Sequence, residues 1–118
     1  MEDNKLNINI ADEDKNTLLI IAAGTSQDDV VKEILKYEPN LNMQNNDGNT
    51  AIMFAIGEKN LNMLKTILDS KNEYDFSIKN NQGKNPIMLA EEKDIPELTN
   101  YIYDSLDNKI SSKNKLKM

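Results

Sequence analysis

The sequence predicts an all-α protein in which three helix–turn–helix units stack side by side and carry protruding turns. Two observations predict this. A turn, a capping residue and a short apolar helix occur together at residues 45–55, and near-copies lie at residues 14–22 and 81–90. The copies recur with a period of roughly 33 residues, which is typical of repeat proteins. Because one such unit cannot bury its own apolar face, neighbouring units must pack on one another to bury it.

The first helix of each unit begins after a residue that can cap it. Thr17, Thr50 and Asn85 occupy this position, and their side-chain oxygens can accept a free N–H of the first helical turn. Gly48 suits the tight turn before Thr50, because glycine accepts the positive φ that such turns require. The first turn has Lys15 at the equivalent position and is therefore expected to be looser.

The second helix of each unit is predicted from apolar residues spaced three and four apart. Asp28 and Asp29 precede the first of these stripes, where negative charge suits the helix dipole. Asn60 is the expected cap of the second stripe, and residues 94–97 read as the start of the third.

These units resemble the ankyrin repeat. The family pattern Thr-Pro-Leu-His-x-Ala is matched at residues 17–22, 50–55 and 85–90, and its Val-Val-x-x-Leu-Leu helix at residues 30–35, 63–68 and 97–102. The resemblance covers residues 6–106 and implies an ankyrin-repeat solenoid with repeats at about 12–44, 45–79 and 80–106. Residues 1–5 are expected to be frayed. Residues 107–118 form a polar, basic tail that is expected to be disordered.

The sequence departs from the family pattern at two kinds of position. No repeat has the family histidine, and an apolar residue replaces it each time: Ile20, Met53 and Met88. We expect these residues, and also the next position in each repeat, to pack in the core; that position holds Ile21, Phe54 and Leu89. The glycine expected between paired helices is also absent, so the loops are expected to be less regular than the overall architecture.

Composition restricts the classes of partner. The formal net charge is −6, and all 14 cationic residues are lysine. An acidic chain repels nucleic-acid phosphates, whereas it can steer toward a basic protein surface. Cysteine is absent, which fits a cytoplasmic location, and no apolar stretch reaches membrane-spanning length. We therefore expect a monomer that binds another protein and contacts neither nucleic acid nor membrane.

The residues needed for common catalytic chemistry are missing. Without histidine or cysteine, the chain has neither imidazole acid–base groups nor a thiolate nucleophile. Asp47 and Gly48 do not continue into a calcium loop, because the regular acidic spacing and closing glutamate are absent. Carboxylate pairs such as Asp28 and Asp29 are expected to be solvated helix ends. The sequence thus favours a non-catalytic protein without cofactor or metal.

The resemblance implies that a partner binds the concave surface formed by the protruding turns, or fingers, and the inner helices. The inner helix is the first helix of each unit. The finger residues expected in this surface are Glu13, Asp14, Asn16, Asn46, Asp47, Asn49, Asn81, Gln82 and Lys84. Those of the inner helices are Gly24, Thr25, Ile56, Glu58, Glu91 and Glu92. Ile56 is expected to be exposed among polar neighbours, either as an anchor for the partner or simply as a tolerated apolar residue.

Two functions remain open. The first is a protein-binding module, in its sharper form an acidic inhibitor or immunity-type protein that masks a basic surface. The alternative is a terminal structural segment of a longer solenoid whose ligand site lies elsewhere, because residues 6–11 resemble the tail of a preceding repeat. An enzyme is the least favoured class, since the search for acid–base and metal groups is empty.

Overall fold

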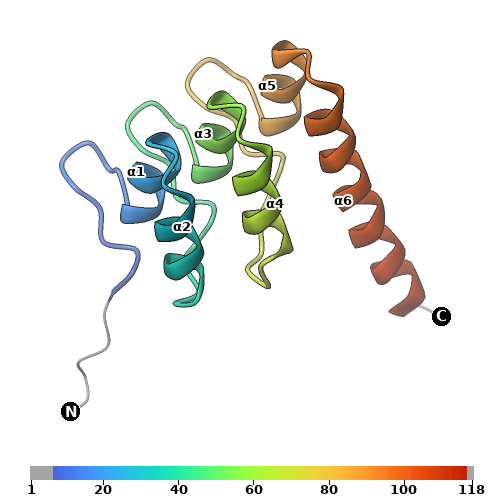
Figure 1. The fold of residues 1–118 in the computed structure, drawn as a ribbon, viewed down its shortest axis with the longest axis horizontal. Coiled ribbons are helices and arrows are strands. Elements are labelled where there is room, and N and C mark those ends of the chain that lie inside the picture. The colour runs from blue at the N-terminus through green and yellow to red at the C-terminus, as the bar shows by residue number, and fades with distance from the viewer. Residues whose placement is uncertain (1–6, 117–118) are drawn as a thin grey trace.

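The computed structural model describes residues 7–116 as three helical hairpins arranged side by side (Figure 1). Each hairpin pairs a short first helix with an antiparallel second helix. The helices are α1 (Leu18–Gly24) with α2 (Asp28–Leu35), α3 (Ala51–Gly57) with α4 (Leu61–Asp69), and α5 (Pro86–Lys93) with α6 (Pro96–Leu116). Within the described residues, β structure is limited to an isolated bridge between Ala11 and Thr17. The predicted all-α stack of three units is confirmed.

The helices form two rows. α1, α3 and α5 pack on one another as the inner row, while α2, α4 and α6 form the outer row. Figure 1 shows the loops that precede α1, α3 and α5 projecting from the same side of the stack. The core lies between the rows and between successive hairpins, and Val31, Leu64 and Ile102 are fully buried there.

All four predicted capping residues make the expected hydrogen bonds. Thr17 Oγ1 accepts the Ile20 N–H over 3.1 Å, and Thr50 Oγ1 accepts the Met53 N–H over 3.3 Å. The Oδ1 atoms of Asn60 and Asn85 likewise accept N–H groups of the first turns of α4 and α5. Each cap satisfies a backbone donor that the helix itself cannot, so these helix starts are encoded locally.

The two methionines at the histidine position have different environments. Met53 is buried as predicted, because α5 packs against its side of α3. Met88 is 42% exposed, so the prediction that it lies in the core is wrong. Within residues 7–116 no further hairpin packs on the outer side of α5, which leaves this face of the last repeat in solvent.

The loops are more regular than expected. The residues between paired helices, Ser26, Lys59 and Asp94, all have φ between 55° and 57°, the left-handed conformation that the family glycine normally supplies. Lys15 in the first finger has φ 65°, close to the 79° of Gly48. The first finger is therefore not looser, and these non-glycine residues hold a conformation that costs them energy.

The polar tail was expected to be disordered from residue 107. Residues 107–116 continue α6, which runs without interruption from Pro96 to Leu116. No proline or glycine follows Pro96 to break the helix, and the remaining residues tolerate helical geometry. The predicted fraying of residues 1–5 lies outside the described part of the chain.

Candidate functional site

Each finger is a turn closed by the side chain of its first residue. We define finger 1, finger 2 and finger 3 as residues 12–16, 45–49 and 80–84. Asp12 Oδ1 accepts the N–H groups of Asp14 and Asn16, both over 2.9 Å. Asn45 closes finger 2 in the same way, with two N–H groups at 3.0 Å, and Asn80 closes finger 3. The three fingers therefore share one geometry.

Backbone hydrogen bonds join successive fingers into a row. The Asn46 N–H donates to the Asp14 carbonyl over 2.9 Å. One repeat later, the Asn81 N–H donates to the Asp47 carbonyl over 3.0 Å. These bonds fix the spacing of the tips, so a partner would meet a preorganised surface rather than three mobile loops.

A second row of hydrogen bonds uses asparagine side chains. Asn45 Nδ2 donates to Asn16 Oδ1, and Asn80 Nδ2 donates to Asn49 Oδ1, each over 3.0 Å. Asn16 and Asn49 are half-buried, and this bond engages the carbonyl oxygen of each side chain. Two predicted binding residues thus position the fingers. Asn45 and Asn80 were not predicted as functional residues, although their recurrence at the first position of a finger is a usable signal.

Most of the other predicted site residues are exposed on the fingers or at the ends of the inner helices. This holds for Glu13, Asp14, Asn46, Asp47, Asn81, Gln82, Thr25, Glu58, Glu91 and Glu92, whereas Gly24 and Lys84 are half-buried. Two of the exposed carboxylates already have partners. Glu91 accepts the Tyr103 hydroxyl over 2.8 Å, which raises the pKa of that phenol, and Glu92 pairs with Lys84.

The prediction for Ile56 is wrong. Its side chain is 0% exposed, because α3 lies between α1 and α5 and also packs on α4. Ile21 on α1, which was expected in the core, is instead 42% exposed. Phe54 and Leu89, at the same repeat position, are half-buried. These three residues, together with the exposed Leu18 and Met88 but without Ile56, give the inner row its accessible apolar surface.

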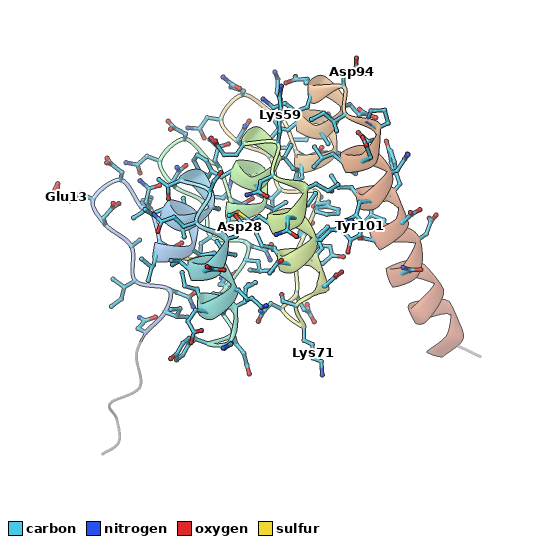
Figure 2. All side chains as sticks on the ribbon, in the orientation of Figure 1. Glu13, Asp28, Lys59, Lys71, Asp94 and Tyr101 are labelled. Carbon is cyan, nitrogen blue, oxygen red and sulfur yellow. The ribbon has the colours of Figure 1, made fainter. Side chains whose placement is uncertain are left out.

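Finger 1 carries the densest charge of the row. Asp12, Glu13 and Asp14 are all exposed, and Lys15 is the single cation among them. Figure 2 shows Glu13 at the outer tip of this finger, pointing away from the helices. Finger 2 has Asp47 as its charged residue, and finger 3 has Lys84. The acidity of the finger row is therefore concentrated at its N-terminal end.

A protein-family model for ankyrin repeats, in three copies, matches residues 2–80, which is more than half of the chain. The chain belongs to the ankyrin repeat family. Ankyrin repeats generally mediate protein–protein interactions and are typically non-catalytic. No curated protein matches this sequence.

The family match ends inside the third ankyrin repeat, at the first residue of finger 3. The structure nevertheless continues the ankyrin architecture there, with a third finger, a capped inner helix and an outer helix. This repeat differs from the second repeat at the end of its inner helix, where Glu91 and Glu92 occupy the positions held by Ile56 and Gly57.

The described residues offer neither a metal site nor a membrane span. No group of three or more acidic side chains among them is arranged to hold a metal ion. In the same part of the chain, no helix combines the length and apolar character needed to cross a bilayer.

Proposed function

We propose that this ankyrin repeat protein is a non-catalytic module that binds another protein through its finger tips and the ends of its inner helices. In its specific form the proposal is an acidic inhibitor or immunity-type protein that masks a basic surface and acts as a monomer in the cytoplasm. One observation carries this proposal: the exposed carboxylates of finger 1 belong to a row of fingers held rigid by hydrogen bonds.

Rigidity and charge act on different parts of the binding free energy. A prebuilt finger row avoids much of the ordering cost that a flexible loop incurs when it binds. The net charge of −6 and the cluster at finger 1 would steer a cationic partner and raise the association rate. Ile21, exposed on the neighbouring inner helix, supplies an apolar contact beside the charged ones.

The test neutralises finger 1 without unfolding it. The triple variant Asp12→Asn, Glu13→Gln, Asp14→Asn removes three charges, and asparagine already closes fingers 2 and 3 at the position of Asp12. Affinity capture from an extract of the native cell should lose the partner with this variant. The wild-type complex should also weaken as salt is raised.

A matched control carries the same change of charge on other surfaces of the molecule. Glu38→Gln, Glu73→Gln and Asp104→Asn alter exposed residues outside the fingers. This control should retain the partner. Equal losses in both triple variants would show that only total charge matters, and capture that is insensitive to salt would contradict the electrostatic form of the proposal.

The second candidate is a terminal structural segment of a longer solenoid. It is favoured by Leu18 and Val30, which are exposed on the N-terminal side of the first repeat. The coding sequence of the native transcript tests it. Further repeats encoded in frame upstream would support this candidate, and a transcript that encodes these residues alone would remove it.

A further inference from the structure

The N-terminal end of the stack carries an open apolar groove. Its volume is about 470 Å³, and it lies between the turn that precedes finger 1 and helices α1 and α2. The apolar residues that line it are Ile8, Leu18, Val30, Ile34 and Tyr37. Leu18, Val30 and Tyr37 are exposed. Such a concentration of apolar surface at one site is typical of an interaction surface.

The repeat register identifies what this groove is shaped to receive. Leu18 is 51% exposed, whereas its counterparts Ala51 and Pro86 in the second and third hairpins are buried. Val30 is likewise exposed, whereas its counterpart Met63 is fully buried. The groove therefore uses positions that are buried in the second hairpin. The complementary shape is a helix or a helical hairpin.

The opposite end of the stack does not fit this groove. Glu91 and Glu92 stand on the outer side of α5 where the preceding repeat has Ile56 and Gly57, and both carboxylates are exposed. A second copy stacked head to tail would have to cover these charges with its own apolar groove, which is costly. The exposed face of α5 therefore carries charged groups, whereas the exposed face of α1 and α2 carries the apolar groove.

The first residue of finger 1 has a hydrogen-bond acceptor where the first residues of fingers 2 and 3 have a donor. Asn45 and Asn80 each donate an amide N–H to the preceding finger, and each is fixed by the two N–H groups that its Oδ1 accepts. Asp12 accepts the same two N–H groups, so its second carboxylate oxygen stands where the others have a donor. A partner that contacts Asp12 at this end would therefore meet an acceptor, which favours a donor on the partner.

The outer helix shows the same reversal. Asn62 donates to the Asp28 carboxylate of the preceding hairpin over 3.1 Å, and the residue equivalent to Asn62 in the first repeat is Asp29. Asp29 is exposed and lines the groove. Glu33 lines it too, but already pairs with Lys36 over 3.1 Å. Two copies meeting groove to groove would bring like charges together, so cationic donors on a different protein are favoured.

We infer that this groove binds an amphipathic helix of another protein, with an apolar stripe on Leu18 and Val30 and with lysine or arginine on Asp12 and Asp29. This surface lies at the N-terminal end of the stack, and Asp12 is the one finger residue that it uses. Its recognition mode is a helix laid in a groove, in which apolar anchors give affinity and flanking charges select the partner.

The test uses the full chain and two synthetic helical peptides of about four turns. Both carry the same leucine stripe, flanked by lysine in one and by glutamate in the other, and binding is followed by fluorescence anisotropy of the labelled peptide. The lysine peptide should bind saturably and the glutamate peptide more weakly. Leu18→Ser and Val30→Ser should each weaken binding of the lysine peptide about tenfold. Asp29→Asn should reduce its salt dependence.

Matched controls come from the other end of the stack. Met88 and Tyr103 are each 42% exposed, so Met88→Ser and Tyr103→Ser remove similar apolar surface there and should leave binding unchanged. Thermal unfolding confirms that each variant is folded. Equal affinity for both peptides, absence of binding, or equal losses from Met88→Ser and Leu18→Ser would overturn the inference. Self-association in sedimentation velocity that Leu18→Ser abolishes would overturn it in favour of a second copy.

Discussion

The backbone nitrogen of Asn81 lies 2.8 Å from the position that a Cβ atom on Gly48 would occupy. Finger 2 can thus approach finger 3 closely only because residue 48 has no side chain. Gly48 and Gly83 both have positive φ, 79° and 77°, but a Cβ on Gly83 would meet no atom within 4 Å. A substitution at Gly83 therefore tests backbone strain alone, whereas one at Gly48 tests backbone strain together with a steric clash between fingers.

Gly48→Ala should therefore destabilise the protein more than Gly83→Ala. Gly83→Ala forces a left-handed alanine and should cost about 1–2 kcal/mol. Gly48→Ala adds a clash with the backbone of finger 3, and we expect at least about 1 kcal/mol more. Urea unfolding of both variants measures the difference. Equal losses would mean that finger 3 moves aside without cost.

Replacing a left-handed lysine by glycine should stabilise the protein. Lys15 and Lys59 have φ of 65° and 57°, and glycine accepts this region without steric penalty. We expect Lys15→Gly and Lys59→Gly each to raise the free energy of unfolding by about 0.5–1 kcal/mol, after the greater freedom of glycine in the unfolded chain is subtracted. Lys32→Gly, on the exposed side of α2, is the control and should lower it by about 1 kcal/mol. Stabilities that change in the same direction in all three variants would refute this explanation.

Truncation of Ile56 should lower stability, whereas truncation of Ile21 should lower partner binding. Ile56→Ala leaves a cavity in the core and should cost about 2–5 kcal/mol of stability. Ile21→Ala removes exposed surface and should change stability by no more than about 0.5 kcal/mol. If the finger row and inner helices bind the partner as proposed, Ile21→Ala should weaken capture while the protein stays folded. Unfolding and capture assays on the same two variants check both parts.

Alkaline pH should weaken the contact between α6 and α4. The Tyr101 hydroxyl donates to the Asp69 carboxylate. Burial, together with this bond, raises the pKa of Tyr101 from 10.0 to about 12. Because the pKa is higher in the folded state, the stabilisation is complete below pH 10 and is lost as the pH rises through about 12.

Two variants check this assignment. Absorbance titration of the phenolates should show a late-titrating tyrosine in the wild type, and this step should be missing in Tyr101→Phe. Asp69→Asn should move the step to lower pH, because the carboxylate that opposes ionisation is gone. A titration that is identical in wild type and Tyr101→Phe would show that Tyr101 does not titrate late.

The helix starts could be predicted because their signals are local. Thr17, Thr50 and Asn85 cap helices only a few residues away, so sequence spacing identifies them. The exposure of Ile56 and Met88 could not be predicted in this way. It depends on whether a neighbouring hairpin covers that face, and neighbours about 30 residues distant leave no mark beside the residue itself.

The row of fingers that we propose as a binding surface was predicted in outline only. The row of fingers follows from repeated turns, whereas the two uses of asparagine within it do not. Asn16 and Asn49 look like surface amides in the sequence, but each accepts a hydrogen bond from the next finger. The left-handed Ser26 and Lys59 also escaped prediction, because packing of the paired helices overrides the preference of these residues for negative φ.

The hydrogen bonds between neighbouring repeats have one further consequence, for synthesis. Asn45 reaches back 29 residues to Asn16, and Asn72 reaches back 37 residues to the Leu35 carbonyl. A nascent chain therefore needs only about one more repeat clear of the ribosome before that repeat can dock on the previous one. Folding can therefore proceed during translation, and the apolar face of each new hairpin is buried soon after the hairpin emerges.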